Sequence, residues 1–228
     1  MNPDLFLVDL SHPLDASTPP FPGNAAVRIE IVDAIPPRTG DGRKHCNASR
    51  LDTSLHCGTH MDAPFHFVAE GTTIDAVSLA RCLGPAVRVR HPTWGPRADI
   101  EVAHLTGYRS SLDAAPRIIF DTGWSRRWGK ADYFTDHPVL TGDTARWLVD
   151  QGVVLVGVDF PSVDRPPHPA HDVLLGNGLV IVENLTRLDA IPTDTFEFCA
   201  LPLAITGRDG SPVRAVARPL PSAMSSRA

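Results

Sequence analysis

One eleven-residue stretch, positions 56–66 (His-Cys-Gly-Thr-His-Met-Asp-Ala-Pro-Phe-His), limits what this chain can fold into more than any other feature. Its imidazoles and carboxylate are donors that hold zinc or manganese, so His56, His60 and Asp62 are candidate metal ligands. A helix would turn Asp62 about 200° away from His60, and the glycine and proline disfavour one. A straight strand would separate His56 from His60 by about 13 Å, too far to share an ion. We therefore predict an extended stretch that bends at Gly58.

The positions between these donors favour a buried segment over the alternative, unrelated polar residues on a solvent-facing strand or loop. Cys57, Met61 and Phe65 are mostly apolar, which indicates that their face packs inward while the histidine face lines a cavity. His66 lies on the histidine face but follows Pro64, whose fixed φ restricts how the chain turns back. We therefore expect His66 to lie near the metal as a general acid and base, not as a ligand.

Length and composition limit the class of protein. With 228 residues, 43% of them hydrophobic, we expect one large domain. The net charge of -5 and the lack of a basic run argue against nucleic acid as a partner. No apolar run approaches the ~20 residues that span a bilayer, residues 1–9 do not resemble a signal peptide, and the four cysteines are too sparse for a disulfide framework. These features predict a soluble, cytoplasmic protein with a small-molecule substrate and no membrane partner.

Short apolar runs between Pro- and Gly-rich loops predict alternating strands and helices. The expected strands are residues 5–10, 26–32, 86–90, 117–121, 153–159, 179–182, 195–205 and 212–217. The expected helices are residues 76–82, 99–105, 141–151 and 172–175. Strand 26–32 alternates apolar and charged residues, which indicates one wet face. Asp143 is the expected cap of helix 141–151, and Phe21, in a rigid proline-rich loop, is either a pocket wall or a packing anchor.

The segments that follow strands 117–121 and 153–159 are expected to border one cleft, residues 122–125 on one side and residues 159–164 on the other. A helix connects the two strands, and ligand groups collect beyond the carboxyl ends of strands joined in this way. Asp159 and Asp164 in the second segment are possible ligands, although an aspartate in such a turn more often accepts hydrogen bonds from the backbone.

Residues 56–67 (H-C-G-T-H-M-D-A-P-F-H-F) resemble the signature of the cyclase family of metal-dependent hydrolases, which includes bacterial kynurenine formamidases and isatin hydrolases. Residues 171–185 (H-D-V-L-L-G-N-G-L-V-I-V-E-N-L) resemble the second ligand segment of that family, with a histidine and a glutamate at this separation. The resemblance runs from about residue 9 to residue 218. Phe21-Pro22-Gly23 also resembles a family element, in which Asn24 departs from the usual aspartate.

The resemblance implies an α/β fold: a single domain, residues 1–218, around a mixed, barrel-like β-sheet with flanking helices, then a frayed tail, residues 219–228. It implies that His171 and Glu183 hold a second divalent ion, zinc or manganese, with Asp62 as a bridge. It also implies a homo-oligomer, a dimer or tetramer. The substrate that it favours is N-formylkynurenine, and we expect Phe21 to contact the substrate.

The most economical mechanism is metal-assisted hydrolysis of an amide bond, in which the ion lowers the pKa of water from ~15.7 to about 7 and His66 moves the protons. Two alternatives stay open. In the first, the substrate is a cyclic amide or a lactone. In the second, the cluster is a closed structural metal site in a binding protein; this alternative is disfavoured because the candidate ligands exceed the four that a structural zinc needs.

Overall fold

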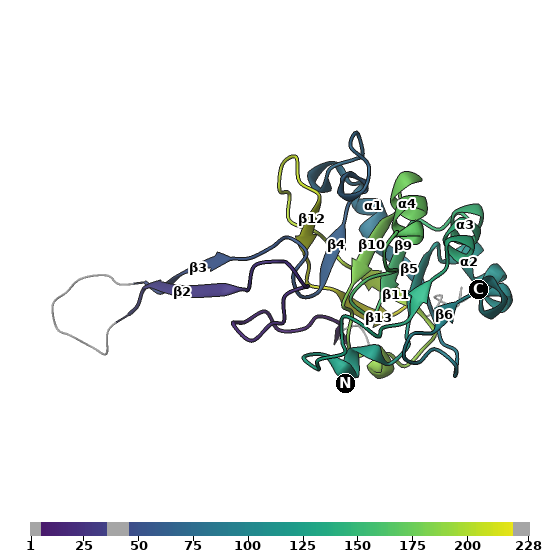
Figure 1. Ribbon diagram of the computed structural model, residues 1–228, viewed down its shortest axis with the longest axis horizontal. Helices are drawn as coiled ribbons and strands as arrows, with labels where there is room; N and C mark the ends of the chain where they lie inside the picture. The colour runs from purple at the N-terminus through teal and green to yellow at the C-terminus, as the bar shows by residue number, and fades with distance from the viewer. Residues whose placement is uncertain (1–5, 36–45, 221–228) are drawn as a thin grey trace, which may run out of the picture.

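The computed structural model describes residues 6–35 and 46–220, and a nine-stranded mixed sheet forms its centre (Figure 1). The strand order is β1-β13-β11-β5-β7-β9-β10-β4-β12. Strands β5, β7, β9 and β10 run parallel, and the remaining neighbours pair antiparallel. The strands are β1 Val8–Asp9, β4 His60–Asp62, β5 Leu83–Val89, β7 Arg117–Phe120, β9 Leu155–Val158, β10 Val180–Glu183, β11 Thr195–Cys199, β12 Gly210–Pro212 and β13 Val216–Pro219.

Short helices connect these strands. The α-helices are α1 Leu79–Cys82, α2 Arg109–Ala114, α3 Gly142–Asp150 and α4 Pro169–Gly176. The 3₁₀ helices are η2 Pro64–His66, η3 Ile74–Ala76, η4 Val102–His104, η5 Thr106–Tyr108, η6 Trp124–Arg127 and η7 Leu188–Ala190. Two small sheets pair β2 Arg28–Asp33 with β3 Ala48–Asp52 and β6 Asp99–Ile100 with β8 Val139–Leu140. No helix in the described segments is long and apolar enough to cross a membrane.

The central strands are buried on both faces, because successive side chains of a strand point to opposite sides. In β7, Ile118 belongs to the core beneath α2, α3 and α4, whereas Ile119 belongs to a second core on the other face. Phe196 and Phe198 of β11 fill that second core together with Met61 of β4. The metal-candidate strand β4 is thus anchored in the second core by Met61, while His60 and Asp62 on its other face line a cavity.

The predicted strand, helix and strand from residue 117 to residue 159 are confirmed, since β7 and β9 pair in parallel and α3 connects them. The predicted helix cap was wrong: the Thr141 side chain, not Asp143, accepts a hydrogen bond from the Thr144 N–H. The predicted domain bounds stay a prediction. Most of the expected tail, from residue 221 on, and the loop at residues 36–45 lie outside the described residues.

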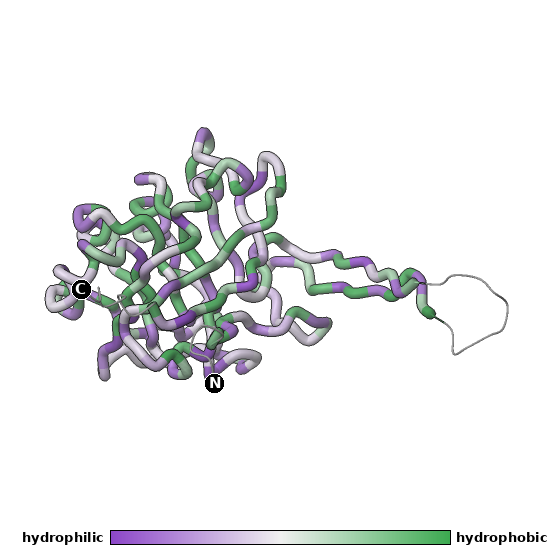
Figure 2. Tube along the Cα trace, turned by 180° about the vertical axis from the view of Figure 1, so that it is seen from behind, coloured by the Kyte–Doolittle hydropathy of each residue, from purple (hydrophilic) through white to green (hydrophobic). Residues whose placement is uncertain are grey.

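Strands β2 and β3 form an arm, residues 28–33 and 48–52, that stands away from the body of the molecule (Figures 1 and 2). The predicted single wet face of β2 was wrong, because all six of its residues are exposed. Ile29 lies opposite Leu51, and Ile31 is 78% exposed on the same face. The other face pairs opposite charges, such as Glu30 opposite Arg50. The arm thus has one apolar and one charged face.

Candidate metal centre

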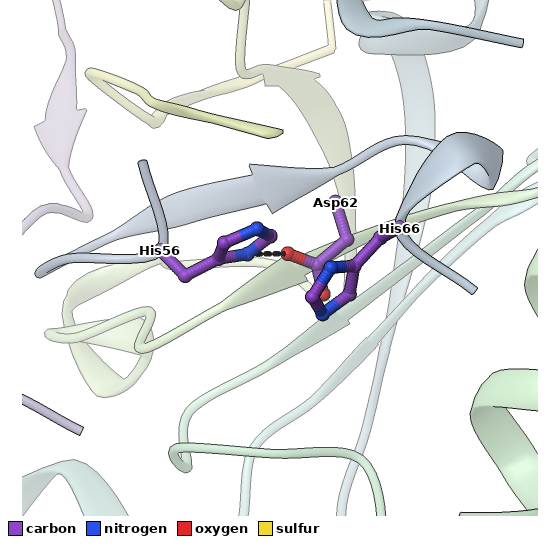
Figure 3. A group of neighbouring side chains, drawn as sticks. All are labelled: His56, Asp62 and His66. Atoms are coloured by element: carbon purple, nitrogen blue, oxygen red, sulfur yellow. Dashed lines mark hydrogen bonds and ion pairs between the residues drawn. The ribbon is translucent and has the colours of Figure 1, made fainter. Parts of the chain in front are cut away.

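The predicted bend in the histidine-rich stretch is confirmed, because Gly58 has a φ of 60° and only residues 60–62 form a strand. The expectation that His66 lies on the same extended face was wrong, since residues 64–66 form a 3₁₀ turn. Bend and turn still bring the side chains together: the rings of His56 and His66 stack at 4.0 Å, with Asp62 beside them (Figure 3). His56, before the short strand β4, and His66, after it, therefore lie close together.

The second ligand segment reaches the first through strand pairing. Strand β10 lies antiparallel to β4, with Glu183 opposite His60, and α4 carries His171 toward them. One cavity of about 590 Å³ unites every site residue predicted from the sequence. These residues are Phe21, His56, His60, Asp62, His66, His171 and Glu183.

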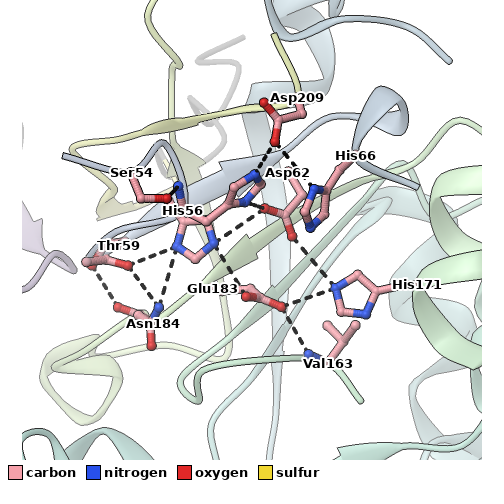
Figure 4. A network of polar contacts seen from close by, with 12 residues as sticks. Ser54, His56, Thr59, Asp62, His66, Val163, His171, Glu183, Asn184 and Asp209 are labelled. Carbon is pink, nitrogen blue, oxygen red and sulfur yellow. Dashed lines mark hydrogen bonds and ion pairs between the residues drawn. The ribbon is translucent and has the colours of Figure 1, made fainter. Parts of the chain in front are cut away.

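Five of these side chains place their donor atoms at the spacing of metal ligands. His60 Nε2 lies 3.4 Å from both Asp62 Oδ1 and Glu183 Oε2, and His56 Nδ1 lies 2.7 Å from Asp62 Oδ1. On the opposite side of the carboxylates, His171 Nε2 lies 3.8 Å from Asp62 Oδ2 and 3.6 Å from Glu183 Oε1 (Figure 4). Ligand atoms about 2.0–2.1 Å from a tetrahedral ion lie roughly 3.3 Å apart, so this donor set fits a divalent metal.

Each of the three histidines is also held through its other ring nitrogen. Nε2 of His56 lies 2.7 Å from Asp209 Oδ2, and Nδ1 of His60 lies 3.0 Å from the carbonyl oxygen of Gly58. Nδ1 of His171 lies 2.7 Å from a carboxylate oxygen of Asp164. Histidine ligands of metals commonly donate their second N–H to such acceptors, which fixes the tautomer and turns the free lone pair toward the ion.

The carboxylates raise the pKa of these histidines against the effect of burial. Burial alone would lower the pKa of His56, but Asp62 and Asp209 raise it to about 9. Neighbouring carboxylates likewise overcome burial and raise the pKa of His60 and His171. The cluster therefore stabilises bound positive charge, from protons or from a metal cation.

The two central carboxylates oppose each other. Burial would raise the pKa of Asp62, but His56 and hydrogen bonds from the histidines hold it well below its usual range. Burial and the charge of Asp62 raise the pKa of Glu183, although the Val163 N–H donates a hydrogen bond to Glu183 Oε1 at 3.0 Å. A divalent cation shared by the two carboxylates would relieve their repulsion.

His66 differs from the other imidazoles. Burial lowers its pKa, which favours the neutral form at neutral pH. Its nearest acidic partner is Asp209, with Nδ1 3.5 Å from Oδ2. One atom each of His56, Asp62 and His66 lie close enough together to hold an ion, so the geometry alone permits His66 as a ligand.

The expected cleft border is correct on one side only. Pro161 and Ser162 line the cavity, whereas residues 122–125 do not. Thr122 instead donates two hydrogen bonds to Asp159, whose pKa burial raises to about 7. Asp164 accepts hydrogen bonds from the first backbone N–H groups of α4, so it acts as the acceptor typical of such turns and holds His171 as well.

Aromatic side chains form the walls of the cavity. Phe21 packs edge-on against Phe134 at 5.6 Å, and Phe67 stacks on His171 at 4.5 Å. Trp128 lines the same cavity. The sequence identified only Phe21 among these, and it missed Asp209, which lies 153 residues from His56 and has no local motif around it.

Comparisons with known proteins agree on one family. The family model described as "Putative cyclase" matches residues 8–165. The chain belongs to the Cyclase family. It is 35% identical to the kynurenine formamidase of Bacillus mycoides (strain KBAB4), over 93% of this chain and 97% of that one. It is 36% identical to the kynurenine formamidase of Paracidovorax citrulli (strain AAC00-1), over 93% and 96% of the two chains.

Solved structures of isatin hydrolases share the fold. Isatin hydrolase A of Labrenzia aggregata matches with a TM-score of 0.80 at 28% identity, over 93% of each chain. Isatin hydrolase A of Ralstonia solanacearum matches with a TM-score of 0.79 at 24% identity, over 93% of this chain and 91% of that one. The predicted fold class, one domain around a curled, mixed sheet, is thereby confirmed. The chain is a metal-dependent hydrolase of the Cyclase family.

Proposed function

We propose that this protein hydrolyses an amide bond outside peptides, in the manner of an arylformamidase, with N-formylkynurenine as the first candidate substrate. One observation carries the proposal. Three histidines, each fixed through its second nitrogen, direct their free nitrogens at two buried carboxylates within an open cavity. An open cavity favours catalysis over the closed structural site, which would leave no room for a substrate.

The residues divide between two ions of zinc or manganese. His56, His60 and Asp62 would hold the first ion, and His171 with Glu183 would hold the second. The two oxygens of Asp62 lie on opposite sides, which fits a bridge between the ions. When bound, the ions would polarise the amide carbonyl and make hydroxide available at neutral pH.

His66 is the proposed general acid and base. Its neutral form can accept the proton of the attacking water and return it to the leaving nitrogen, which is worth about 10² to 10⁴ in rate. Phe21 and Phe134 offer flat apolar surface to an aryl group beside this imidazole. A cyclic aromatic amide, as in isatin hydrolases, or a lactone is the alternative substrate for the same walls.

Metal removal tests the proposal directly. Dialysis against a chelator should abolish hydrolysis of formanilides, and zinc or manganese should restore it, because the donor atoms have no other common role. A parallel screen of cyclic imides and lactones separates the candidate substrates. Full activity in a preparation shown to be metal-free would refute the metal-dependent mechanism.

The number of ions has a separate test. Glu183→Gln should lower the metal content per chain while the site of His56, His60 and Asp62 stays occupied. Metal analysis of the variant beside the parent protein measures this difference. Equal stoichiometry in the two proteins would argue for a single ion.

The proposed assembly is a homo-oligomer, a dimer or tetramer. A two-stranded hairpin alone is at best marginally stable in water, yet Ile29, Ile31 and Leu51 expose an apolar face on the arm. A second copy of the chain packed on this face would cover it. A cytoplasmic location also remains part of the proposal, and the four cysteines, all free in the structure, are compatible with it.

A further inference from the structure

We propose that Asp209 is a positioning residue for hydrolysis, which holds His66 so that its Nε2 atom faces the reacting groups. This inference rests on the proposed role of His66 in proton transfer. Oδ2 of Asp209 lies 3.5 Å from Nδ1 of His66 and 2.7 Å from Nε2 of His56. A single carboxylate oxygen thus joins the proposed general base to a proposed metal ligand.

The stacking of the two imidazoles makes this contact specific. The rings of His56 and His66 lie 4.0 Å apart with planes 29° from parallel, so one oxygen at their edge reaches both. Figure 4 shows one nitrogen of His66 toward Asp209 and the other on the opposite edge of the ring, on the side of His171. Among the described residues, Asp209 is the one carboxylate within 4.0 Å of a His66 ring nitrogen, although the charge of Asp62 also acts on this ring.

The sheet, not a loose loop, places this carboxylate. The carbonyl oxygen of Asp209 accepts a hydrogen bond from the Ala63 N–H at 2.9 Å, directly after the proposed ligand Asp62. Gly210, the first residue of β12, pairs with Asp62 in β4. A Cβ atom at position 210 would lie 2.7 Å from Cε1 of His56, so glycine lets the imidazole lie against β12. The carboxylate is therefore held in register with the metal-candidate strand.

The chemical consequence is a choice of tautomer. A carboxylate next to Nδ1 keeps the proton of neutral His66 on that atom, which leaves the lone pair of Nε2 free to accept a proton. Without Asp209 the ring can rotate and either nitrogen can carry the proton. A base that faces the wrong way slows the reaction but does not weaken substrate binding.

Kinetics of a double-mutant cycle test this role at saturating metal with formanilide as substrate. Asp209→Ala should lower kcat about 10- to 100-fold with little change in KM, and Asp209→Glu should recover part of the loss. In a His66→Ala background, Asp209→Ala should have no further effect on kcat, because both changes remove one function. An equal loss in both backgrounds would show that Asp209 acts through His56 or the fold, and would overturn the proposal.

The second test measures the tautomer of His66 by NMR and needs no substrate. Long-range ¹H–¹⁵N spectra of the histidine rings, on metal-loaded protein, should report the Nδ1–H tautomer of His66 in the parent and lose that preference in Asp209→Ala. An unchanged tautomer would contradict the inference even if kcat fell. If His66→Ala alone kept full activity, the proposed function of His66 would fail, and this result is distinguishable from failure of the Asp209 role.

Discussion

At the scale of the residue, a second contact fixes the orientation of each of the three histidines proposed as metal ligands. One ring nitrogen of each histidine lies at hydrogen-bond distance from an acceptor: Asp209 for His56, the Gly58 carbonyl for His60 and Asp164 for His171. The other ring nitrogen, which faces the carboxylates, therefore has little freedom to turn. Pre-set ligands lose less conformational entropy when an ion binds, which favours affinity. The same contact separates the proposed ligands from His66, whose Nδ1 lies farther from its acceptor, 3.5 Å from Asp209 Oδ2.

Substitution should divide the two classes of histidine. His66→Ala should fold and keep near-normal metal content but lose roughly 10² or more in kcat, the effect of a missing general acid and base. His60→Ala should lose metal and activity together. Metal analysis and steady-state kinetics on both variants measure the difference. Metal depletion in His66→Ala would make His66 a ligand and leave Asp164 as the next candidate for proton transfer.

His137 should make the fold sensitive to acid. Burial and then the charge of Arg165 lower its pKa to about 4, and the opposing effect of backbone groups of Asp164 and Phe134 is smaller. Between pH 6.5 and pH 4 the unfolded chain therefore binds a proton that the folded chain does not, so stability falls as the pH falls.

A variant without the titrating ring isolates this effect. The difference in the free energy of unfolding between His137→Gln and the parent should shift in favour of the variant as the pH is lowered. Between pH 8 and pH 4 this shift should reach about 3 kcal/mol. Urea unfolding at both pH values, with a chelator present throughout, provides the free energies. Parallel pH profiles for the two proteins would contradict the prediction.

At the scale of the element, the short strand β4 positions the site because it pairs on both sides. Strand β10 brings Glu183 opposite His60, and β12 brings Gly210 opposite Asp62. The local motif was sufficient to predict the bend and to select His56, His60 and Asp62 as neighbours in one cavity, because both depend on residues close in sequence. Asp209 could not be predicted from local pattern, because strand pairing across 153 residues brings it to His56.

The close approach of β12 provides a test of this pairing. In Gly210→Ala the new Cβ would meet the His56 ring and the carbonyl oxygen of Met61 at 2.8 Å, so the ring or the strand must shift. We expect metal affinity to fall about 10- to 100-fold. Gly176→Ala, at the end of α4 with no atom within 4 Å of the new Cβ, is the matched control. Equal affinities in a competitive metal titration of the two variants would contradict the argument.

At the scale of the whole molecule, the arm is the feature that the sequence described least well. Alternation in β2 predicted a strand correctly, but such a pattern does not distinguish an apolar face that is buried within the chain from one that is exposed. The order of the nine strands was likewise beyond prediction from periodicity, since it depends on long-range pairing. The family resemblance, by contrast, predicted the curled mixed sheet.

Charge on the apolar face of the arm should disrupt the proposed assembly. Ile31→Glu would bury a carboxylate against the second copy, at a cost on the order of 2 kcal/mol, or about thirtyfold in the dissociation constant. Glu30→Gln, on the charged face, is the control and should leave the assembly intact. Light scattering over a range of concentrations measures the mass. A monomeric parent protein would refute the oligomer.

The pairing of β4 with β10 also decides when the centre can exist during synthesis. The hydrogen bond from Asn184 to Gly58 closes a loop of 126 residues beside the cluster, and the contact of Asp209 with His56 closes one of 153. The histidines of the bend leave the ribosome long before their partners, and such distant contacts form late because closing long loops is costly in entropy. The complete set of proposed ligands therefore assembles late in folding, and a chain interrupted before residue 171 would carry only three of the five, His56, His60 and Asp62.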